Sequence, residues 1–357
     1  MLKDTFNRNL KDLRISVTDR CNFRCTYCMP AEIFGESYEF LPKEEILSFE
    51  EISRLASIFV ELGVEKIRIT GGEPLMRNNL QQLVFLLNEV PGIKDLTLTT
   101  NGYLLDQQAE GLKKAGLSRI TVSLDTLDDE LFKKMNGRGF DTKRVLSGIE
   151  SANQVGLSPI KINSVVQKNV NDHTIVDLAR HFKGTGHIVR FIEYMDVGNL
   201  NAWKLNEVVP ASEILRKIDS ELPLEPLSPN YTGEVASRYK YKDGSGEIGI
   251  ISSVSQPFCG HCTRARLSTD GRLYTCLFGE TGLNLRDPMR DGATPEELKA
   301  LITTCWEKRD DKYSEYRTLN SSGQSSANKI EMYQIGGEEY LTRVIICHVI
   351  RPTMVVL

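Results

Sequence analysis

Polar and apolar residues alternate in short segments through the first half of the chain, and helical spacing follows each segment. Six segments predict β-strands, at residues 13–19, 66–72, 95–102, 119–125, 159–166 and 187–195. The intervening stretches predict helices at 48–62, 79–90, 106–115, 142–155 and 172–182. The first of these is the clearest, because Ser48 and Glu51 form a capping box ahead of an apolar face. A repeat of about 30 residues is typical of βα units around a parallel sheet.

One face of each predicted strand is apolar and the other is polar. In the first strand, Ser16 and Thr18 share a face with Arg14, while Ile15 and Val17 share the opposite face. Buried parallel strands are usually apolar on both faces, and a closed barrel of eight strands fills its interior with apolar side chains. We therefore expect an α/β fold, an open and incomplete (β/α)6 barrel whose polar lumen is the binding site. The sixth strand alternates less clearly.

The pattern changes after residue 195. Segments 237–241 and 247–253 predict a β-hairpin, residues 294–306 predict a late helix, and residues 311–334 predict irregular structure. The apolar run at 344–350 predicts an added strand or an aggregation-prone tail. We expect three parts: the partial barrel at 1–196, a C-terminal extension carrying the hairpin and a second cysteine site at 197–337, and an atypical tail at 338–357.

Charge and hydropathy exclude several classes of protein. The 357 residues include 44 basic and 48 acidic side chains, with a formal charge of −4, which argues against a general nucleic-acid binder. No apolar stretch reaches the ~18 residues that a membrane-spanning helix needs. Residues 1–14 lack the apolar centre of a secretory signal. The sequence therefore predicts a cytoplasmic protein with neither a nucleic-acid nor a membrane partner.

The first group of cysteines follows the first predicted strand directly. Cys21, Cys25 and Cys28 form a CxxxCxxC spacing. Three thiolates on one tight loop can hold three irons of a cubane cluster, which leaves the fourth iron open to a small molecule. Zinc would require four ligands, and no histidine is close in sequence. The spacing therefore favours an iron–sulfur cluster over zinc.

The second group of cysteines lies more than 200 residues later. Cys259, Cys262 and Cys276 form a CxxCx13C spacing. His261 lies between the first two, but its ring is poorly placed to share a tetrahedron with its own loop neighbours. From the residues alone, zinc and a second cluster fit this group about equally well.

Basic residues gather on the predicted inward faces. Arg264 and Arg266 point the same way on an extended segment, as suits bidentate phosphate binding. Arg14, Arg68 and Lys161 lie on inward faces of the predicted barrel strands. Several unpaired cations are costly in a nearly dry lumen, so a polyanion such as a nucleoside triphosphate is the expected ligand.

A glycine pair ends the second predicted strand. Gly71 and Gly72 allow the backbone to approach a ligand closely. The carbonyl groups there, or the carboxylate of Glu73, could hold an ammonium group.

These motifs are similar to those of radical S-adenosylmethionine (radical SAM) enzymes. Four segments sharpen the resemblance, namely TDRCNFRC at 18–25, TGGEPL at 70–75, TTNG at 99–102 and FIEYMD at 191–196. They resemble the GTP 3′,8-cyclase family of molybdenum cofactor biosynthesis, and the similarity runs through nearly the whole chain. The resemblance implies a lyase-type enzyme that converts GTP to (8S)-3′,8-cyclo-7,8-dihydroguanosine 5′-triphosphate, the first step of molybdopterin biosynthesis.

The resemblance also implies cofactors, contacts and partners. The cofactors would be S-adenosylmethionine and two [4Fe–4S] clusters, held by Cys21, Cys25, Cys28, Cys259, Cys262 and Cys276. Contacts to S-adenosylmethionine would come from Tyr27, Gly71, Gly72, Glu73, Ser123 and Met195. Contacts to GTP would come from Arg14, Arg68, Thr99, Lys161, Arg264, Ala265 and Arg266. The implied partners are an electron donor, a downstream cyclic pyranopterin monophosphate synthase and a second copy of the chain.

One feature departs from the family pattern. Family members end in a Gly-Gly pair that enters the active site to assist catalysis, a role that the resemblance assigns to Gly336 and Gly337, whereas here twenty residues follow this pair. The sequence therefore predicts reduced or absent cyclisation with substrate binding retained. Three alternatives stay open at this point: a radical SAM peptide maturase, a non-catalytic nucleotide or iron–sulfur sensor, and a zinc-binding structural protein.

Overall fold

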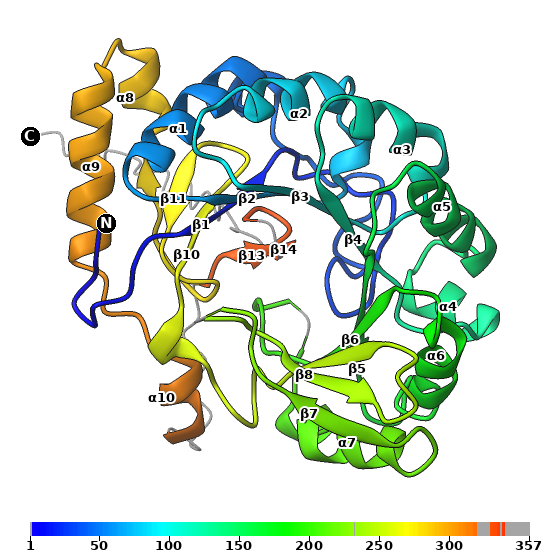
Figure 1. Ribbon diagram of the computed structural model, residues 1–357. Helices are drawn as coiled ribbons and strands as arrows, with labels where there is room; N and C mark the ends of the chain where they lie inside the picture. The colour runs from blue at the N-terminus through cyan, green and yellow to red at the C-terminus, as the bar shows by residue number, and fades with distance from the viewer. Residues whose placement is uncertain (1, 201, 232, 320–328, 336–337, 340–357) are drawn as a thin grey trace, which may run out of the picture.

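The computed structural model describes residues 2–200, 202–231, 233–319, 329–335 and 338–339. Six parallel strands lie side by side in chain order, and they confirm the predicted (β/α)6 arrangement. They are β1 Asp12–Ser16, β2 Lys66–Thr70, β3 Asp95–Thr100, β4 Arg119–Ser123, β5 Lys161–Val166 and β6 Ile188–Glu193. Helices cover the outside of this curved sheet (Figure 1). They are α1 Phe49–Glu61, α2 Leu80–Asn88, α3 Leu105–Lys114, α4 Asp129–Met135, α5 Thr142–Gln154 and α6 Ile175–Phe182.

The first helix shows how local sequence fixes an element. Ser48 accepts a hydrogen bond from the backbone N–H of Glu51, and the Glu51 carboxylate accepts one from Ser48 N, so the predicted capping box is present. Gly63 follows the helix with a φ of 112°, a conformation that glycine adopts without strain. Ile52, Leu55 and Phe59 are buried on the face towards the sheet. Burial of each such side chain stabilises the fold by roughly 1.5–3 kcal/mol.

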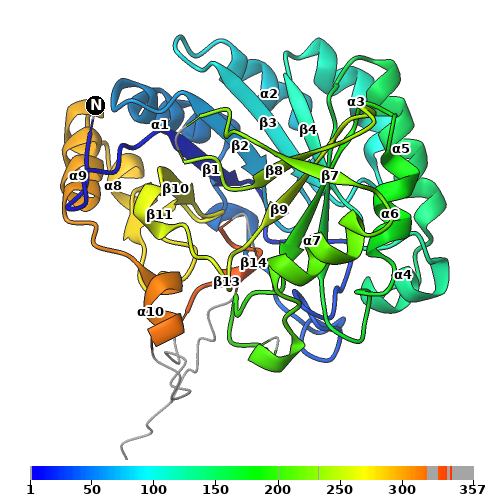
Figure 2. The same cartoon turned by 60° about the horizontal axis from the view of Figure 1, so that its bottom comes forward.

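The C-terminal half extends the same sheet at both edges. At one edge β9 Glu247–Ile251 pairs in parallel with β6, and β8 Ser237–Tyr241 and β7 Leu224–Leu227 follow in antiparallel order, which confirms the predicted hairpin. At the other edge β10 Arg264–Leu267 pairs in parallel with β1, followed by β11 Arg272–Tyr274 and β12 Leu283–Asn284. Figure 2 shows β10 and β11 next to β1, with β7, β8 and β9 together in front of the other barrel strands. Because β7 and β12 do not pair, the barrel stays open.

Further helices flank the extensions. They are α7 Ala211–Asp219, α8 Arg286–Arg290, α9 Pro295–Glu307 and α10 Tyr313–Leu319, with short 3₁₀ turns at Lys43–Glu45, Pro74–Met76, Leu205–Glu207 and Cys259–His261. The late helix predicted at 294–306 is confirmed by α9. Within the described part of the chain, no helix has the length and apolar character to cross a bilayer.

The prediction of irregular structure at 311–334 is wrong for two segments. Helix α10 occupies Tyr313–Leu319, and β13 Glu331–Met332 pairs with β14 Glu338–Glu339. Tertiary contacts stabilise α10, because Tyr313 donates a hydrogen bond to Asp196 (2.6 Å) and Arg317 donates one to the carbonyl of Ser253 (2.7 Å). Such contacts leave no periodic signal in the sequence. The strand predicted at 344–350 lies outside the described residues.

Candidate active site

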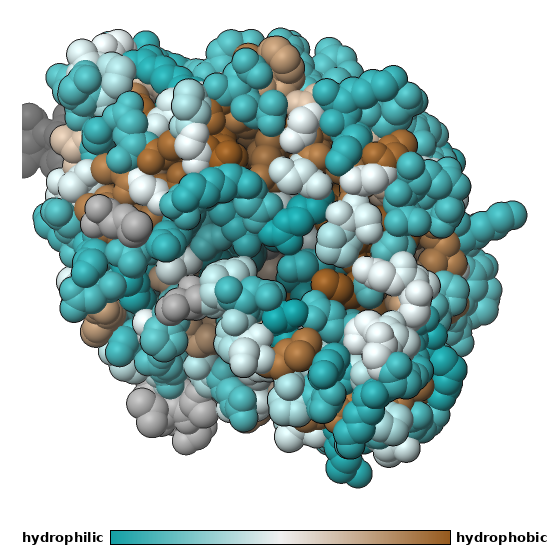
Figure 3. Space-filling model, viewed as in Figure 1, coloured by the Kyte–Doolittle hydropathy of each residue, from teal (hydrophilic) through white to brown (hydrophobic). Residues whose placement is uncertain are grey.

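A cavity of about 590 Å³, lined by both charged and apolar residues, occupies the lumen of the barrel. The hydrophilic hollow at the centre of Figure 3 opens into this region. All six cysteines of the two predicted groups line the cavity, although more than 200 residues separate the groups. The two cysteine sets therefore face one shared chamber.

The first cysteine set lies on the loop that follows β1. The backbone N–H of Cys28 donates to the carbonyl of Cys25 (3.0 Å), which forms a tight turn. Arg24 fixes this loop from within, since its Nη1 donates to the carbonyl of Cys21 and its Nε to that of Phe34, both at 2.7 Å. Phe23 adds an aromatic anchor by stacking on Phe140, with ring centroids 5.4 Å apart. These contacts hold the cysteine loop in place without requiring a bound cluster.

The glycine pair after β2 is required by this loop. A Cβ added at Gly72 would lie 2.3 Å from the carbonyl oxygen of Arg20, and one at Gly71 would lie 2.7 Å from that of Thr18. The N–H of Gly72 donates to Thr18 O (2.7 Å) and that of Glu73 to Arg20 O (2.7 Å). Both glycines also line the cavity. The sequence suggested that the backbone of these glycines approaches a ligand closely. In the structure this backbone packs closely against the residues that lead into the cysteine loop.

Glu73 is a buried carboxylate at the same end of the sheet. It accepts hydrogen bonds from Thr100 Oγ1 (2.7 Å) and from the backbone N–H of Asn101 (2.7 Å) and Leu75 (3.0 Å). Burial raises the pKa of Glu73 to about 7, against the opposing effect of these hydrogen bonds. The carboxylate therefore ties the glycine turn to the end of β3 while it lines the cavity.

The other residues expected to contact S-adenosylmethionine also reach the lumen. Tyr27, Ser123 and Met195 line the cavity. The hydroxyl of Tyr27 donates to Asp125 Oδ2 (2.8 Å), and burial raises the pKa of Asp125 to about 6. Asp125 also accepts from the backbone N–H of Val165, so it fixes the Tyr27 hydroxyl from a strand end.

The second cysteine set lies beside β10 and β11. The N–H of Cys262 donates to Cys259 O (3.1 Å), and the N–H of Phe278 donates to Cys276 Sγ (3.5 Å). Burial and Asp311 raise the pKa of Cys276 to about 12. Burial opposes ionisation of Cys262 too, but Arg264 and Arg309 outweigh it and lower its pKa to about 6.

The chemistry of the donor sets fits clusters better than a single ion. Among the residues that the structure describes, no three His, Cys, Asp or Glu side chains converge as ligands of one metal ion. The thiolates of a cubane cluster bind different irons and so lie further apart than the ligands of one ion. His261 is exposed and does not line the cavity. Each set thus offers three thiolates to the chamber, and no histidine of the described residues lines it.

Cations line the cavity between the two sets. Arg14, Arg68, Thr99, Lys161, Arg264 and Arg266 all reach the cavity, as predicted from strand alternation and family resemblance. Arg68 Nη1 donates to Thr99 Oγ1 at 2.8 Å. Burial and neighbouring cations lower the pKa values of Arg14 to about 9, Arg68 to about 10 and Lys161 to about 7. Burial and repulsion both disfavour the charged forms, so the wall is poised to accept an anion.

Ala265 is placed differently from its neighbours. It is fully buried in the hydrophobic core, because alternate residues of β10 point to opposite faces of the sheet. Its side chain does not line the cavity. Only its backbone is available to a ligand from the face where Arg264 and Arg266 lie.

Arg190 is a cavity residue that the sequence analysis missed. It lines the chamber from β6, donates to Asn163 Oδ1 (2.9 Å), and has its pKa lowered to about 10 by burial and Arg119. Its inward neighbours Ile188 and Ile192 are apolar, which hides the alternation in this strand. The sequence signal that could have identified Arg190 as a site residue is a single arginine within an otherwise apolar strand. Within the described ranges, no acidic side chain forms an ion pair with Arg190.

Two of the predicted site residues lie outside the described residues. These are Gly336 and Gly337, for which the sequence analysis predicts a catalytic role. The preceding residue, Ile335, is fully buried, and its carbonyl accepts a hydrogen bond from Arg266 Nη1 (3.3 Å).

Comparisons with known proteins agree with this site. Residues 15–182 match the Radical SAM superfamily, and residues 187–315 match Molybdenum Cofactor Synthesis C. A GTP 3′,8-cyclase from Acidothermus cellulolyticus is 49% identical over 358 residues, which cover 94% of this chain and 99% of the relative. One from Staphylococcus haemolyticus is 49% identical over 337 residues with the same coverage.

The chain belongs to the GTP 3′,8-cyclase family. It is therefore a radical SAM enzyme, of a superfamily that uses a [4Fe–4S] cluster with S-adenosylmethionine, and Cys21, Cys25 and Cys28, the predicted ligands of that cluster, line the cavity.

Solved structures agree on the fold of this GTP 3′,8-cyclase family member. Streptococcus suis SuiB bound to S-adenosylmethionine aligns with a TM-score of 0.59 and 18% identity, over 90% of this chain and 78% of that chain. The anSMEcpe structure with bound AdoMet and the Cp18Cys peptide aligns with a TM-score of 0.54 and 17% identity, over 91% and 94% of the two chains. At these identities the likeness shows a common fold and carries no information on substrate.

Proposed function

We propose that this protein is a GTP 3′,8-cyclase acting in molybdenum cofactor biosynthesis, with a second [4Fe–4S] cluster on Cys259, Cys262 and Cys276. The observation that carries the proposal is the single chamber lined by both cysteine sets and by the cations between them. The 49% identity to GTP 3′,8-cyclases supports the same reaction and favours it over the peptide-maturase alternative.

The proposed roles of the side chains follow from their positions. Arg14, Arg68, Lys161, Arg190, Arg264 and Arg266 bind the triphosphate, since guanidinium groups suit bidentate contact with phosphate. Tyr27, Gly71, Gly72, Glu73, Ser123 and Met195 shape the site for S-adenosylmethionine. When bound, the reduced cluster and S-adenosylmethionine supply the radical chemistry, and this chain supplies orientation and exclusion of water.

Without a bound polyanion, the buried cations of the cavity wall repel one another. Lys161 has a pKa of about 7 because it is buried and faces Arg190 and Arg119. A triphosphate would stabilise the ammonium form and thereby raise this pKa. Binding therefore offsets the repulsion between these cations and gives them hydrogen-bond acceptors, which favours nucleoside triphosphates over nucleosides.

The proposal also covers the setting of the enzyme. An electron donor, a downstream cyclic pyranopterin monophosphate synthase, a homodimer and a cytoplasmic location remain part of it. The proposal also includes the division of the chain into three parts, with boundaries after residues 196 and 337. Each follows from the family resemblance and the sequence.

The decisive experiment is anaerobic incubation of the purified protein with GTP, S-adenosylmethionine and dithionite. Mass analysis should detect the cyclised nucleotide together with 5′-deoxyadenosine, in smaller amounts from the full chain than from a chain truncated after Gly337. Tight GTP binding with no 5′-deoxyadenosine would favour the sensor alternative. A protein that holds zinc instead of iron would refute the proposal.

A further inference from the structure

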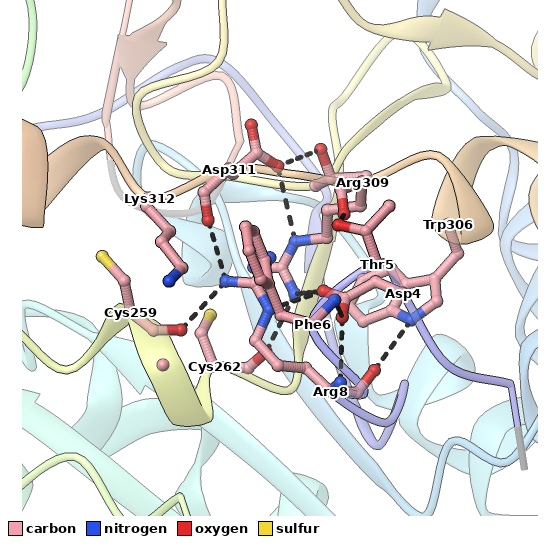
Figure 4. Close-up of polar contacts among 12 residues, drawn as sticks. Asp4, Thr5, Phe6, Arg8, Cys259, Cys262, Trp306, Arg309, Asp311 and Lys312 are labelled. Atoms are coloured by element: carbon pink, nitrogen blue, oxygen red, sulfur yellow. Dashed lines mark hydrogen bonds and ion pairs between the residues drawn. The ribbon is translucent and has the colours of Figure 1, made fainter.

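The N-terminal segment, residues 2–10, folds against the second cysteine set. It forms a tight turn in which Asp4 Oδ1 accepts hydrogen bonds from the backbone N–H of Phe6 (3.0 Å) and Arg8 (2.9 Å). Arg8 O in turn accepts a hydrogen bond from the indole N–H of Trp306 in α9 (3.2 Å). Figure 4 shows this turn beside Cys259 and Cys262.

Two buried arginines share the carboxylate of Asp4. Arg8 Nε lies 2.5 Å from Asp4 Oδ2, and Arg309 Nη1 lies 3.4 Å from the same oxygen. All three residues are nearly inaccessible, with at most 7% of each exposed. A buried ion pair seldom adds net stability, because desolvation offsets its attraction. Its presence here points to a positioning role.

Each arginine holds one carbonyl of the cysteine loop. Arg8 Nη1 donates to Cys259 O (2.9 Å), and Arg309 Nη1 donates to Cys262 O (2.8 Å), as dashed lines in Figure 4 show. Charge-assisted hydrogen bonds of this kind are about twice as strong as neutral ones. The two carbonyls belong to the first two cysteines of the second set.

The third cysteine is connected to the same network. Thr275, which precedes Cys276, donates to Asp311 Oδ2 (2.6 Å), and Arg309 Nε lies 3.4 Å from that oxygen. Arg8 Nη1 also donates to Asp311 O (2.8 Å). The network therefore reaches all three positions of the second set.

The guanidinium of Arg8 carries one more donor group. Its Nη2 is buried and has no hydrogen-bond partner among the described residues, and Arg8 lines the cavity together with Cys259 and Cys262. A buried donor without a partner is costly. A sulfide or thiolate of a bound cluster would satisfy it, as hydrogen bonds to cluster sulfurs commonly do.

The first cysteine set is held differently. Arg24, which fixes that loop, lies within the loop itself, whereas Arg8 and Arg309 are separated from Cys259 by 251 and 50 residues in sequence. Disturbance of the N-terminal turn should therefore affect one set and leave the other in place.

We propose that Asp4, Arg8 and Arg309 are positioning residues for the second cluster, so that the N-terminal turn forms part of that site. This inference rests on the proposed second [4Fe–4S] cluster. The three residues fix the carbonyls that set the separation of the thiolates, and Arg8 completes the hydrogen bonding of the bound cluster.

The test compares Arg8→Gln, Arg309→Gln and wild type after anaerobic reconstitution. Wild type should hold about eight irons per chain, and each variant about four, since only the second [4Fe–4S] cluster is lost. Reductive cleavage of S-adenosylmethionine at the first cluster should persist in both variants. Arg309→Lys retains a donor for Cys262 O and should recover part of the lost iron. Arg180→Gln is the matched control, because the ion pairs of Arg180 within the described residues are exposed and join it to Asp177 and Glu221.

A second measurement covers variants that fail to fold. In full-length Cys262→Ser, which loses the second cluster, amide hydrogen exchange in residues 2–10 should speed up about tenfold, because coupling between turn and cluster is reciprocal. Cys28→Ser should leave that exchange unchanged.

The outcomes distinguish absence of the second cluster from absence of the positioning role. Four irons in wild type would refute the second cluster itself. Eight irons in wild type and in both arginine variants, or equal exchange of residues 2–10 in Cys262→Ser and wild type, would overturn the positioning role alone. Loss of both clusters from a folded arginine variant would also overturn it.

Discussion

Replacement of Gly72 by alanine should disable the first cluster without unfolding the barrel. The added Cβ would lie 2.3 Å from Arg20 O and 2.6 Å from its carbonyl carbon. Non-bonded carbons prefer about 3.5–4.0 Å, so the backbone of Arg20 must move by about 1 Å. Arg20 directly precedes Cys21. Overpacking of this kind costs about 1–3 kcal/mol of stability, and a misplacement of about 1 Å can slow a reaction about 100-fold.

The assay is the rate of 5′-deoxyadenosine formation under dithionite, normalised to iron content. We expect Gly72→Ala to lower this rate by about 100-fold, or to lose the iron of the first cluster. Gly111→Ala is the matched control: nothing lies within 4 Å of a Cβ at this position on α3, and alanine should stabilise the helix by roughly 0.8–1.0 kcal/mol. Wild-type iron content and an undiminished rate in Gly72→Ala would refute the argument that glycine is needed for loop contact.

Three further predictions concern the substrate. Lys161 has a pKa of about 7, so its amino group is mostly neutral at pH 8 and mostly charged near pH 6. GTP binding should therefore take up a proton at pH 8 that it does not take up near pH 6. Calorimetry in buffers of different ionisation enthalpy measures this proton uptake, and Lys161→Met should abolish it. Arg68→Met should weaken GTP binding by about 10–100-fold while leaving S-adenosylmethionine binding intact, and equal GTP affinity would exclude Arg68 as a phosphate ligand. Truncation after Gly337 should speed cyclisation relative to the full chain, whereas equal rates would remove any effect of the last twenty residues.

Strand alternation predicted most of the barrel and its inward cations. Arg14 and Arg68 could be placed because polar residues occur two apart on each side of them. Arg190 could not, since Ile188 and Ile192 share its face. The alternation signal therefore fails wherever a lumen is partly apolar.

The contacts around the second cysteine set could not be predicted at all. Arg8 meets Cys259, and Arg309 meets Asp4, across 251 and 305 residues of sequence, and their sequence neighbours show no shared pattern. Helix α10 was missed for the same reason, because Tyr313 and Arg317 are held by distant partners. Sequence periodicity reports local burial, whereas these features depend on pairing across long separations.

The pairing of β10 with β1 has a consequence for biosynthesis. Asp12 of β1 is opposite Arg264 of β10. Strand β1 is therefore synthesised roughly 250 residues before β10, which pairs with it. At about 5–20 residues per second this interval lasts about 12–50 s. Throughout that time one side of β1 presents unsatisfied backbone groups that can recruit another nascent chain. The yield of active enzyme is therefore expected to depend on chaperones that cover this edge during translation.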